Sequence, residues 1–202
     1  AVLTIQEGLT LEQTAERVEA AYGISKDEFL AQAKASKYAD DYPFLEGAYN
    51  DSLEGYLYPK TYTFTGAPSA DDIIRKLLDQ FVSETASLNL DKGANGLSAQ
   101  QIVTMASLIK RETAVDSERP TIASVIYNLL GADMPLQIDA AIVYARGGRY
   151  QAVTYSDLEI DSPCIVFKNY GLAPGPICSP SISSIKAALN PDKTDYLYYV
   201  AS

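Results

Sequence analysis

The 202-residue sequence contains no histidine and no tryptophan, and it has only two cysteines. Without histidine, the chain cannot build a Ser-His-Asp triad, a Cys-His dyad or a histidine-ligated zinc site. Cys164 and Cys178 are too few for a zinc site of their own, and they could form one disulfide or remain two buried thiols. We therefore expect chemistry that uses no metal and no other cofactor.

Long apolar runs and an excess of positive charge are also missing. No run approaches the ~18 consecutive apolar residues of a transmembrane helix. The 16 basic and 26 acidic residues give a net charge of −10, which argues against nucleic acid or an anionic membrane as the main partner but allows a neutral or zwitterionic polymer. The chain opens on a strand-like stretch with neither an initiator Met nor a signal peptide, so we expect a piece of a longer protein.

Tyrosine, in contrast, is abundant, with 15 in the chain. Its flat apolar body and polar tip suit a sugar-binding groove, although packing in the core is the commoner role for any one of them. A length of 202 residues and a hydrophobic content of 47% are enough for the core of one large domain or two small ones.

Capping residues and apolar spacing predict a mostly helical chain with a few short strands. Strand character is expected at 2–5, 164–167 and 196–200, and half-buried extended chain at 53–64. The predicted helices span residues 11–22, 26–36, 70–88, 99–115, 120–130 and 182–189, with shorter ones at 140–144 and 155–161. A polar, glycine-containing loop at 91–96 is the expected boundary between an N-terminal subdomain, 1–96, and a second subdomain, 97–202.

Glu112 is the acidic residue that the helical pattern singles out. It continues the spacing of three and four residues that defines the apolar stripe of the helix 99–115, after Ile102, Met105 and Ile109. Burial would disfavour the ionised carboxylate and raise its pKa, which suits a general acid that protonates a leaving oxygen. The alternative is a structural glutamate paired with Lys110, Arg111 or Arg119, and this is the commoner reason for such a residue.

Seven segments, in order along nearly the whole chain, resemble the endolytic murein transglycosylases, also called the YceG-like or MltG family. They are IQEGLT (5–10), LEGYLYPKTY (53–62), MASLIKRETAVDSERPTIASVIYN (105–128), LQIDAAIVY (136–144), GLAPGPI (171–177), SIKAALNP (184–191) and DYLYYV (195–200). The resemblance implies an α+β fold with a mostly helical, lysozyme-like catalytic core around Glu112 and small flanking strands.

The same resemblance implies an activity and a location. The family cuts the glycan strands of peptidoglycan internally, between N-acetylmuramic acid and N-acetylglucosamine, and leaves a 1,6-anhydro ring on the muramic residue. Its catalytic Glu ends an E/Q-K/R-E motif, which here falls on Lys110-Arg111-Glu112. Its members are anchored in the bacterial cell membrane by one N-terminal helix and act on the extracytoplasmic side, with cell-wall synthases as suggested partners.

Further site residues follow from the family's pattern. Substrate binding is implied for Ser117, Glu118, Arg119, Asn128, Gln137, Asp139, Gly175, Pro176 and Ile177. The first three would support the end of the Glu112 helix or contact sugar, and Gln137 and Asp139 would line the groove. Residues 175–177 would form a wall whose backbone groups bind the glycan's amides. A structural role is an equal alternative for each, such as Asp139 as a helix N-cap.

The chain departs from the family's pattern at several positions. Leu129 replaces a basic residue, Ile138 and Ala140 replace Thr and Pro, and Cys164–Phe167 replaces Tyr-Asn-Thr-Tyr. Since the last change removes four polar groups, a catalytically weakened peptidoglycan-binding or scaffold domain is one alternative function. The chain also stops at Ser202, where the family continues, so a truncated C-terminal end is expected.

A muramidase that admits water is the other alternative. Such a hydrolase would need a second carboxylate, about 5–5.5 Å from the first in a retaining enzyme or about 6.5–9.5 Å in an inverting one. By motif, Glu118 and Asp139 are the nearby candidates. A lytic transglycosylase needs only Glu112.

Overall fold

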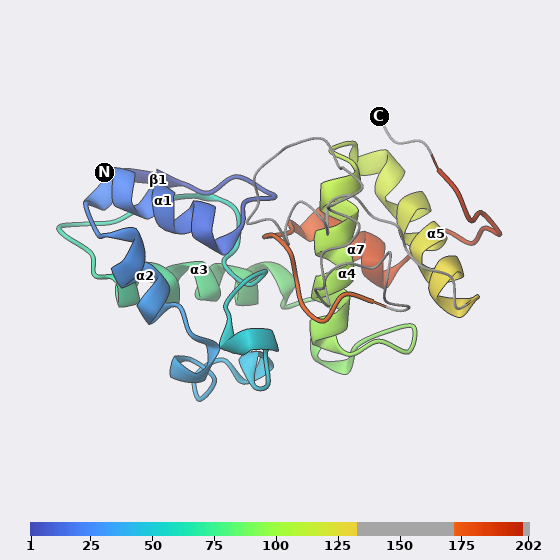
Figure 1. Ribbon diagram of the computed structural model, residues 1–202, viewed down its shortest axis with the longest axis horizontal. Coiled ribbons are helices and arrows are strands. Elements are labelled where there is room, and N and C mark those ends of the chain that lie inside the picture. Colours follow the sequence, from blue (N-terminus) through green and yellow to red (C-terminus); the bar gives the residue numbers. More distant parts are fainter. Residues whose placement is uncertain (133–171, 200–202) are drawn as a thin grey trace, which may run out of the picture.

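The computed structural model describes residues 1–132 and 172–199, and the structural statements below concern these residues. The N-terminal part contains α1 (Leu11–Tyr22), α2 (Lys26–Gln32), α3 (Ala70–Thr85) and a small sheet, whereas α4 (Ala99–Glu112), α5 (Arg119–Gly131) and α7 (Ile182–Leu189) pack against one another in the other part (Figure 1). Short 3₁₀ helices occupy Ala35–Lys37, Pro43–Leu45, Tyr49–Asp51, Leu90–Lys92 and Asp116–Glu118. The predicted α+β class is confirmed.

The sheet consists of β1 (Val2–Thr4) and β2 (Thr61–Thr63), which pair antiparallel with Leu3 opposite Tyr62. Both of these side chains are buried, and their neighbours in each strand are exposed, as expected for a two-stranded sheet with one face on the core. Only the last part of the predicted extended region 53–64 therefore forms a strand.

Side-chain caps explain where the helices begin. The hydroxyl of Ser98 accepts a hydrogen bond from the Gln101 N–H, and the Gln101 side chain accepts one from the Ser98 N–H, which is the capping box that the sequence predicts for α4. Equivalent boxes at Thr10 and Ser69 start α1 and α3. Helices α1 and α7 have their predicted bounds.

Three predicted helices end earlier than expected. After α2, Lys34 forms a bridge with Ser52, so the chain cannot stay helical to residue 36. After α3, the Leu88 N–H donates to the carbonyl oxygen of Thr85, three residues back, and Asn89 adopts a left-handed backbone conformation, so the helix does not reach residue 88. After α4, Thr113 is extended, and its hydroxyl accepts from the Val115 N–H at 3.0 Å, which leaves Glu112 as the last helical residue.

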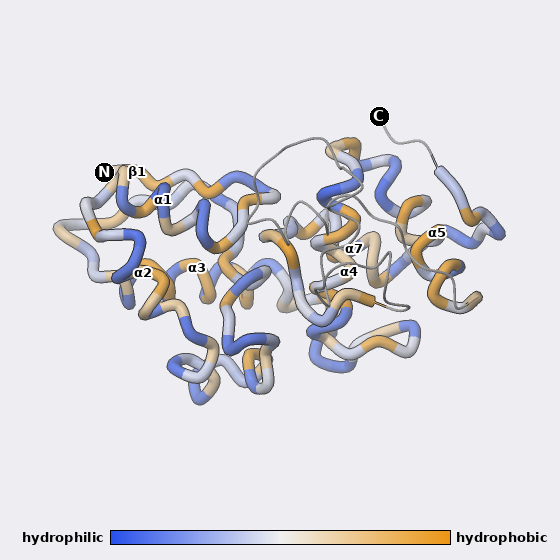
Figure 2. The backbone as a smooth tube through the Cα atoms, in the orientation of Figure 1, coloured by the Kyte–Doolittle hydropathy of each residue, from blue (hydrophilic) through white to orange (hydrophobic). Residues whose placement is uncertain are grey.

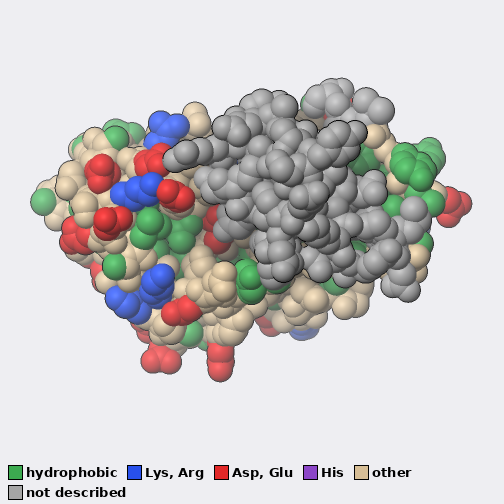
Figure 3. All heavy atoms as spheres, in the orientation of Figure 1, with side chains coloured by type: hydrophobic (Ala, Val, Ile, Leu, Met, Phe, Trp, Pro, Cys, Tyr) green, Lys and Arg blue, Asp and Glu red, His purple; other side chains and the backbone are tan. Residues whose placement is uncertain are grey.

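The core runs through both parts of the chain. Hydrophobic residues of α3 and α4 supply much of it, and they alternate with hydrophilic residues along the helices (Figure 2). On the N-terminal part of the face in Figure 3, acidic and basic side chains are interspersed. The described part of that face thus carries no extended basic patch of the kind that binds phosphate backbones.

Two of the family-like segments pack directly on each other. Gly55, in the segment 53–62, has φ +94°, and a Cβ added there would lie 2.4 Å from Cβ of Pro176. A Cβ on Gly175 would lie 2.9 Å from Cβ of Tyr49. Glycine at these positions therefore allows the loop before α7 to cross the N-terminal part closely. The proposed boundary at residue 96 stays a prediction.

Cys178 is a free, fully buried thiol, and burial raises the pKa of its Sγ far above the ordinary value. Its Sγ lies 3.4 Å from the carbonyl oxygen of Ser107 in α4. The sequence allowed either a disulfide or two buried thiols, and Cys178 is a buried thiol. Cys164 lies outside the described residues.

Candidate active site

Glu112 lies at the C-terminal end of α4, where the helix leaves the core. Residues 102–109 are all buried, Lys110 is half-buried and Arg111 is exposed. Glu112 itself is half-buried rather than fully buried, because the apolar stripe reaches the surface in this last turn. It lines a cavity of about 350 Å³, together with Gln13, residues 7–9 and the other residues of 110–114.

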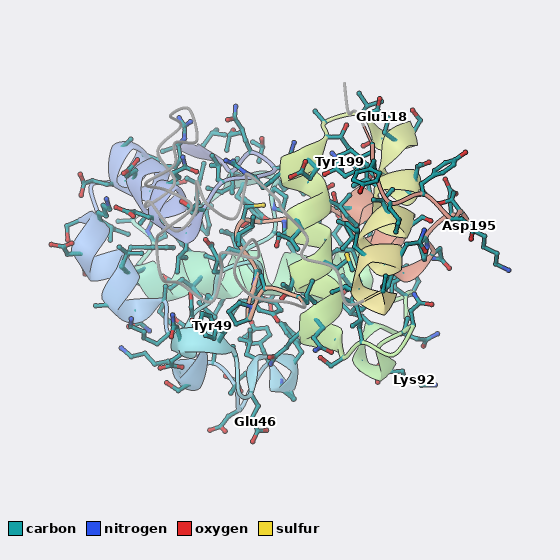
Figure 4. The ribbon with its side chains drawn as sticks, turned by 45° about the vertical axis from the view of Figure 1, so that its right-hand side comes forward. Glu46, Tyr49, Lys92, Glu118, Asp195 and Tyr199 are labelled. Carbon is teal, nitrogen blue, oxygen red and sulfur yellow. The ribbon has the colours of Figure 1, made fainter. Side chains whose placement is uncertain are left out.

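Tyr199 reaches the same carboxyl from the other end of the chain. Its hydroxyl donates a hydrogen bond to Oε2 of Glu112 at 2.5 Å. Tyr199 and Glu118 both lie near the C-terminal end of α4 in Figure 4. The sequence segment 195–200 had no site residue assigned to it, so Tyr199 is a functional candidate that sequence reasoning missed.

The three cations considered as partners of Glu112 each have another described partner. Arg119 and Lys110 both face Glu7, at 2.8 Å and 3.8 Å respectively between nitrogen and Oε1. Arg111 donates to the carbonyl oxygen of Gly8 at 3.4 Å. These contacts tie the end of α4 to the N-terminal segment.

Residues Glu7–Leu9 form one wall of the cavity. Gly8 donates to the Ser179 carbonyl at 2.9 Å, and Ser179 donates back to the Leu9 carbonyl at 2.9 Å, so this segment is clamped beside the loop before α7. Gly8 has φ +92°, and a Cβ there would lie 3.0 Å from Cε of Lys110. The IQEGLT segment is thus pressed against the last turn of α4.

Glu7 is a second candidate that sequence reasoning missed. Its two carboxylate oxygens accept from the Arg119 guanidinium at 2.8 and 3.1 Å, and Oε2 also accepts from the Ser181 N–H at 2.8 Å. Burial raises the pKa of Glu7, but hydrogen bonds from Arg119 and Ser181 and the charge of Arg119 outweigh it, so the pKa lies below the ordinary 4.5. Glu7 therefore faces the cavity as a carboxylate anion.

The residues that follow Glu112 are placed at the same end of α4 but in different surroundings. Ser117 is exposed on the 3₁₀ helix before α5. Glu118 is half-buried and accepts from the Thr113 hydroxyl at 2.7 Å, so it braces the turn next to Glu112. Arg119 is only 2% exposed, and besides Glu7 it donates to the Ser184 hydroxyl of α7 at 2.8 Å.

The other predicted substrate-binding residues are not gathered around Glu112 where the structure describes them. Asn128 lines a separate polar cavity of about 400 Å³ beside residues 191–195. The backbone N–H of Ile177 donates to the Ser107 hydroxyl at 3.1 Å, and this occupies one of the groups expected to bind glycan amides. Gln137 and Asp139 lie outside the described residues.

Neither a metal centre nor a membrane span is found in the described ranges 1–132 and 172–199. No three His, Cys, Asp or Glu side chains there gather as the ligands of a metal ion would. None of the helices in those ranges has both the length and the apolar character to cross a bilayer.

Comparison with known proteins places the chain in a family. A model of the YceG-like family matches residues 1–202. A protein of Bacillus subtilis (strain 168) named endolytic murein transglycosylase is 40% identical over 210 residues, which cover 98% of this chain and 58% of that protein. A protein of the same name from Streptococcus pneumoniae serotype 2 is 36% identical over 222 residues, which cover 100% of this chain and 40% of that protein.

A solved structure agrees with the sequence comparison. The crystal structure of a yceG-like protein from Listeria monocytogenes matches with a TM-score of 0.92 and 39% identity, over 100% of this chain and 70% of that one. The chain spans 58% and 40% of the length of the two curated relatives. The resemblance carried by the seven segments is confirmed, and the chain belongs to the YceG-like family.

Proposed function

We propose that this chain is the catalytic region of a lytic transglycosylase that cuts peptidoglycan glycan strands internally, with Glu112 as its acid and base. The observation that carries the proposal is the position of Glu112, a half-buried carboxyl at the end of a buried helix, beside a cavity. The names of the Bacillus and Streptococcus relatives support the substrate and the reaction.

The reaction needs one carboxyl group and no water. Protonated Glu112 donates its proton to the glycosidic oxygen while C1 of the N-acetylmuramic residue gains oxocarbenium character and the C1–O bond breaks. The resulting carboxylate takes the proton of the C6 hydroxyl of the same sugar as that oxygen bonds to C1. The products are a new end on the departing N-acetylglucosamine side and a 1,6-anhydro-muramic end, and Glu112 is protonated again.

The second carboxylate in the cavity supports this mechanism over hydrolysis. Glu7 is held by Arg119 and the Ser181 N–H, and its pKa lies below the ordinary range. A carboxylate that is bound in this way is a poor base for a water molecule, because protonation would break its pairing with a buried guanidinium. Glu118 is engaged by Thr113.

The products of murein digestion test the proposal. Intact murein is incubated with the purified protein, and the released fragments are analysed by mass spectrometry. Anhydro-muropeptides with internal cuts are the expected result. Reducing ends would instead show a muramidase, and unchanged glycan would show a binding or scaffold domain, so either of these outcomes contradicts the proposal.

The proposal extends to substrate contacts and location, both supported by the family resemblance. Ser117 and Glu118 would contact the sugar beside the cleaved bond, because they follow Glu112 at the same end of α4. The full-length protein would be anchored by one N-terminal helix in the cell membrane, with this region on the extracytoplasmic side near cell-wall synthases. Membrane fractionation with protease accessibility tests the location, and release of the full-length protein into the cytosolic fraction would contradict it.

A further inference from the structure

The segment that carries Tyr199 is fastened to α5 by a row of polar contacts. We call residues 191–199 the C-terminal segment. Thr121 donates to Oδ2 of Asp192 at 2.7 Å, and Ser124 and Thr194 share a hydrogen bond of 2.7 Å between their hydroxyls. Thr121, Ser124 and Asn128 recur at spacings of three and four and therefore lie on one face of α5.

Asn128 fixes the outer end of this segment. Its side-chain amide donates to the carbonyl oxygens of Thr194 at 2.8 Å and Tyr196 at 3.0 Å. From there the C-terminal segment turns and returns toward the C-terminal end of α4 (Figure 1), with Asp195 at its outer edge in Figure 4. Both donor hydrogens of the Asn128 amide are thus used to hold backbone, and the chain leaves this anchor directed toward Glu112.

The hydrogen bond from Tyr199 acts on a side chain at a helix end. Glu112 is the last residue of α4, so a hydrogen bond from a distant segment contributes to holding its carboxyl in one orientation. A phenol O–H that donates to a carboxylate also stabilises the ionised form over the protonated one. Tyr199 therefore acts on both the direction and the proton affinity of Glu112.

We propose that Tyr199 is a positioning residue for Glu112, and that the polar face of α5 holds it in place through the C-terminal segment. As far as catalysis is concerned, the inference rests on the proposed function. In this proposal Asn128 acts on Glu112 indirectly, because it anchors the C-terminal segment and does not contact sugar.

Several other charges surround Glu112 and must stay constant in a test of pH dependence. Lys110 and Arg111 lie on its own helix, Glu7 lies on the N-terminal segment, and all three line the same cavity. Glu118 is connected to the neighbouring Thr113. A substitution that changes only the Tyr199 hydroxyl leaves these four charges in place.

Tyr199→Phe tests the inference, with Tyr198→Phe as its matched control. Tyr198 is 82% exposed on the same segment, so the control removes the same hydroxyl one residue away. We expect Tyr199→Phe to lower kcat about 10- to 100-fold with little change in KM. The alkaline limb of its pH–rate profile should move to higher pH, because the ionised form of Glu112 has lost a donor. Tyr198→Phe should match the parent in both measurements.

Asn128→Ala tests the anchor separately. We expect the same loss in kcat and the same displacement of the pH–rate profile, and the double variant Asn128→Ala with Tyr199→Phe should be no worse than Tyr199→Phe alone. If Asn128 instead binds sugar, Asn128→Ala raises KM and its effect adds to that of Tyr199→Phe, which contradicts the anchor.

Carbon NMR titration of the Glu112 carboxyl separates this inference from the proposed function. The resonance is assigned by its loss in Glu112→Gln, and its midpoint is measured without any substrate. A midpoint at higher pH in Tyr199→Phe but not in Tyr198→Phe supports the inference. An unchanged midpoint in Tyr199→Phe overturns it, whether or not the parent protein cuts murein.

Discussion

Glu112→Gln is expected to lower the rate of glycan cleavage about 100- to 10,000-fold, the usual contribution of a general acid or base. The amide has nearly the same shape as the carboxyl, and its oxygen can still accept the hydrogen bond from Tyr199. It cannot donate a proton to the glycosidic oxygen or take one from the C6 hydroxyl. The rate of anhydro-muropeptide release measures the loss, and circular dichroism and murein co-sedimentation check the fold and binding.

Glu46→Gln is the control for this experiment. Glu46 is an exposed acidic residue on the N-terminal part, far from the C-terminal end of α4 in Figure 4, so the control makes the same change of charge away from Glu112. We expect it to cut at the parent's rate. If Glu112→Gln cuts as fast as Glu46→Gln, Glu112 is not the acid and the assignment is wrong.

Glu7→Gln is expected to produce the largest loss of stability, about 3–5 kcal/mol in the free energy of unfolding at neutral pH. The variant takes from the guanidinium of Arg119, which is 2% exposed, the carboxylate at 2.8 Å, and it leaves the largely exposed Asp116 as a more distant anion at 3.5 Å. Urea unfolding followed by circular dichroism measures the loss. Glu12→Gln, which breaks an exposed pair with Lys26, should cost far less and serves as the control.

The pH dependence of that loss has a definite sign. The pKa of Glu7 in the folded protein lies below the ordinary 4.5, so its contribution to stability is fully present above about pH 4.5 and disappears as the pH falls through the folded-state pKa. The difference in unfolding free energy between the parent and Glu7→Gln should therefore shrink in acid. A difference that stays constant from neutral pH into strong acid would count against this role for the ion pair.

The local parts of the structure could be read from the sequence. Apolar spacing and the capping box of Ser98 and Gln101 located α4 and included Glu112 in it, because these signals act over three or four residues. The final turn was placed three residues too far, since nothing in the pattern shows that the Thr113 hydroxyl caps the neighbouring turn.

The prediction of a strand at 196–200 was wrong over its described residues, 196–199. Alternation of large side chains favours a strand, but Tyr196 and Tyr198 are exposed, and backbone carbonyls near them bond to the Asn128 side chain on α5 instead of to a neighbouring strand. A polar side chain on a distant helix thus replaced the expected sheet partner.

The partners of the site residues could not be predicted from the sequence either, because they lie on distant segments of the chain. Glu7 is 112 residues from Arg119, and Tyr199 is 87 residues from Glu112. Charge and spacing rules describe neighbours on one helix or strand, and they carry no information about which distant segments meet. The family-like segments 5–10 and 195–200 marked both regions, but no pairing of their side chains followed from that.

The contacts of Glu7 and Tyr199 also affect the stage of folding at which the surroundings of the Glu112 carboxyl are complete. We expect the contacts that close loops of 87 and 112 residues to form after the helices between them, because the entropy of loop closure opposes these contacts until the helices have folded. A nascent chain, or one clipped by a protease near one end, would carry Glu112 on a folded α4 without the contacts made by Glu7 or by Tyr199. Removing the chain from Tyr199 onward should therefore lower the rate of murein cleavage at least as much as Tyr199→Phe, while circular dichroism still shows folded helices.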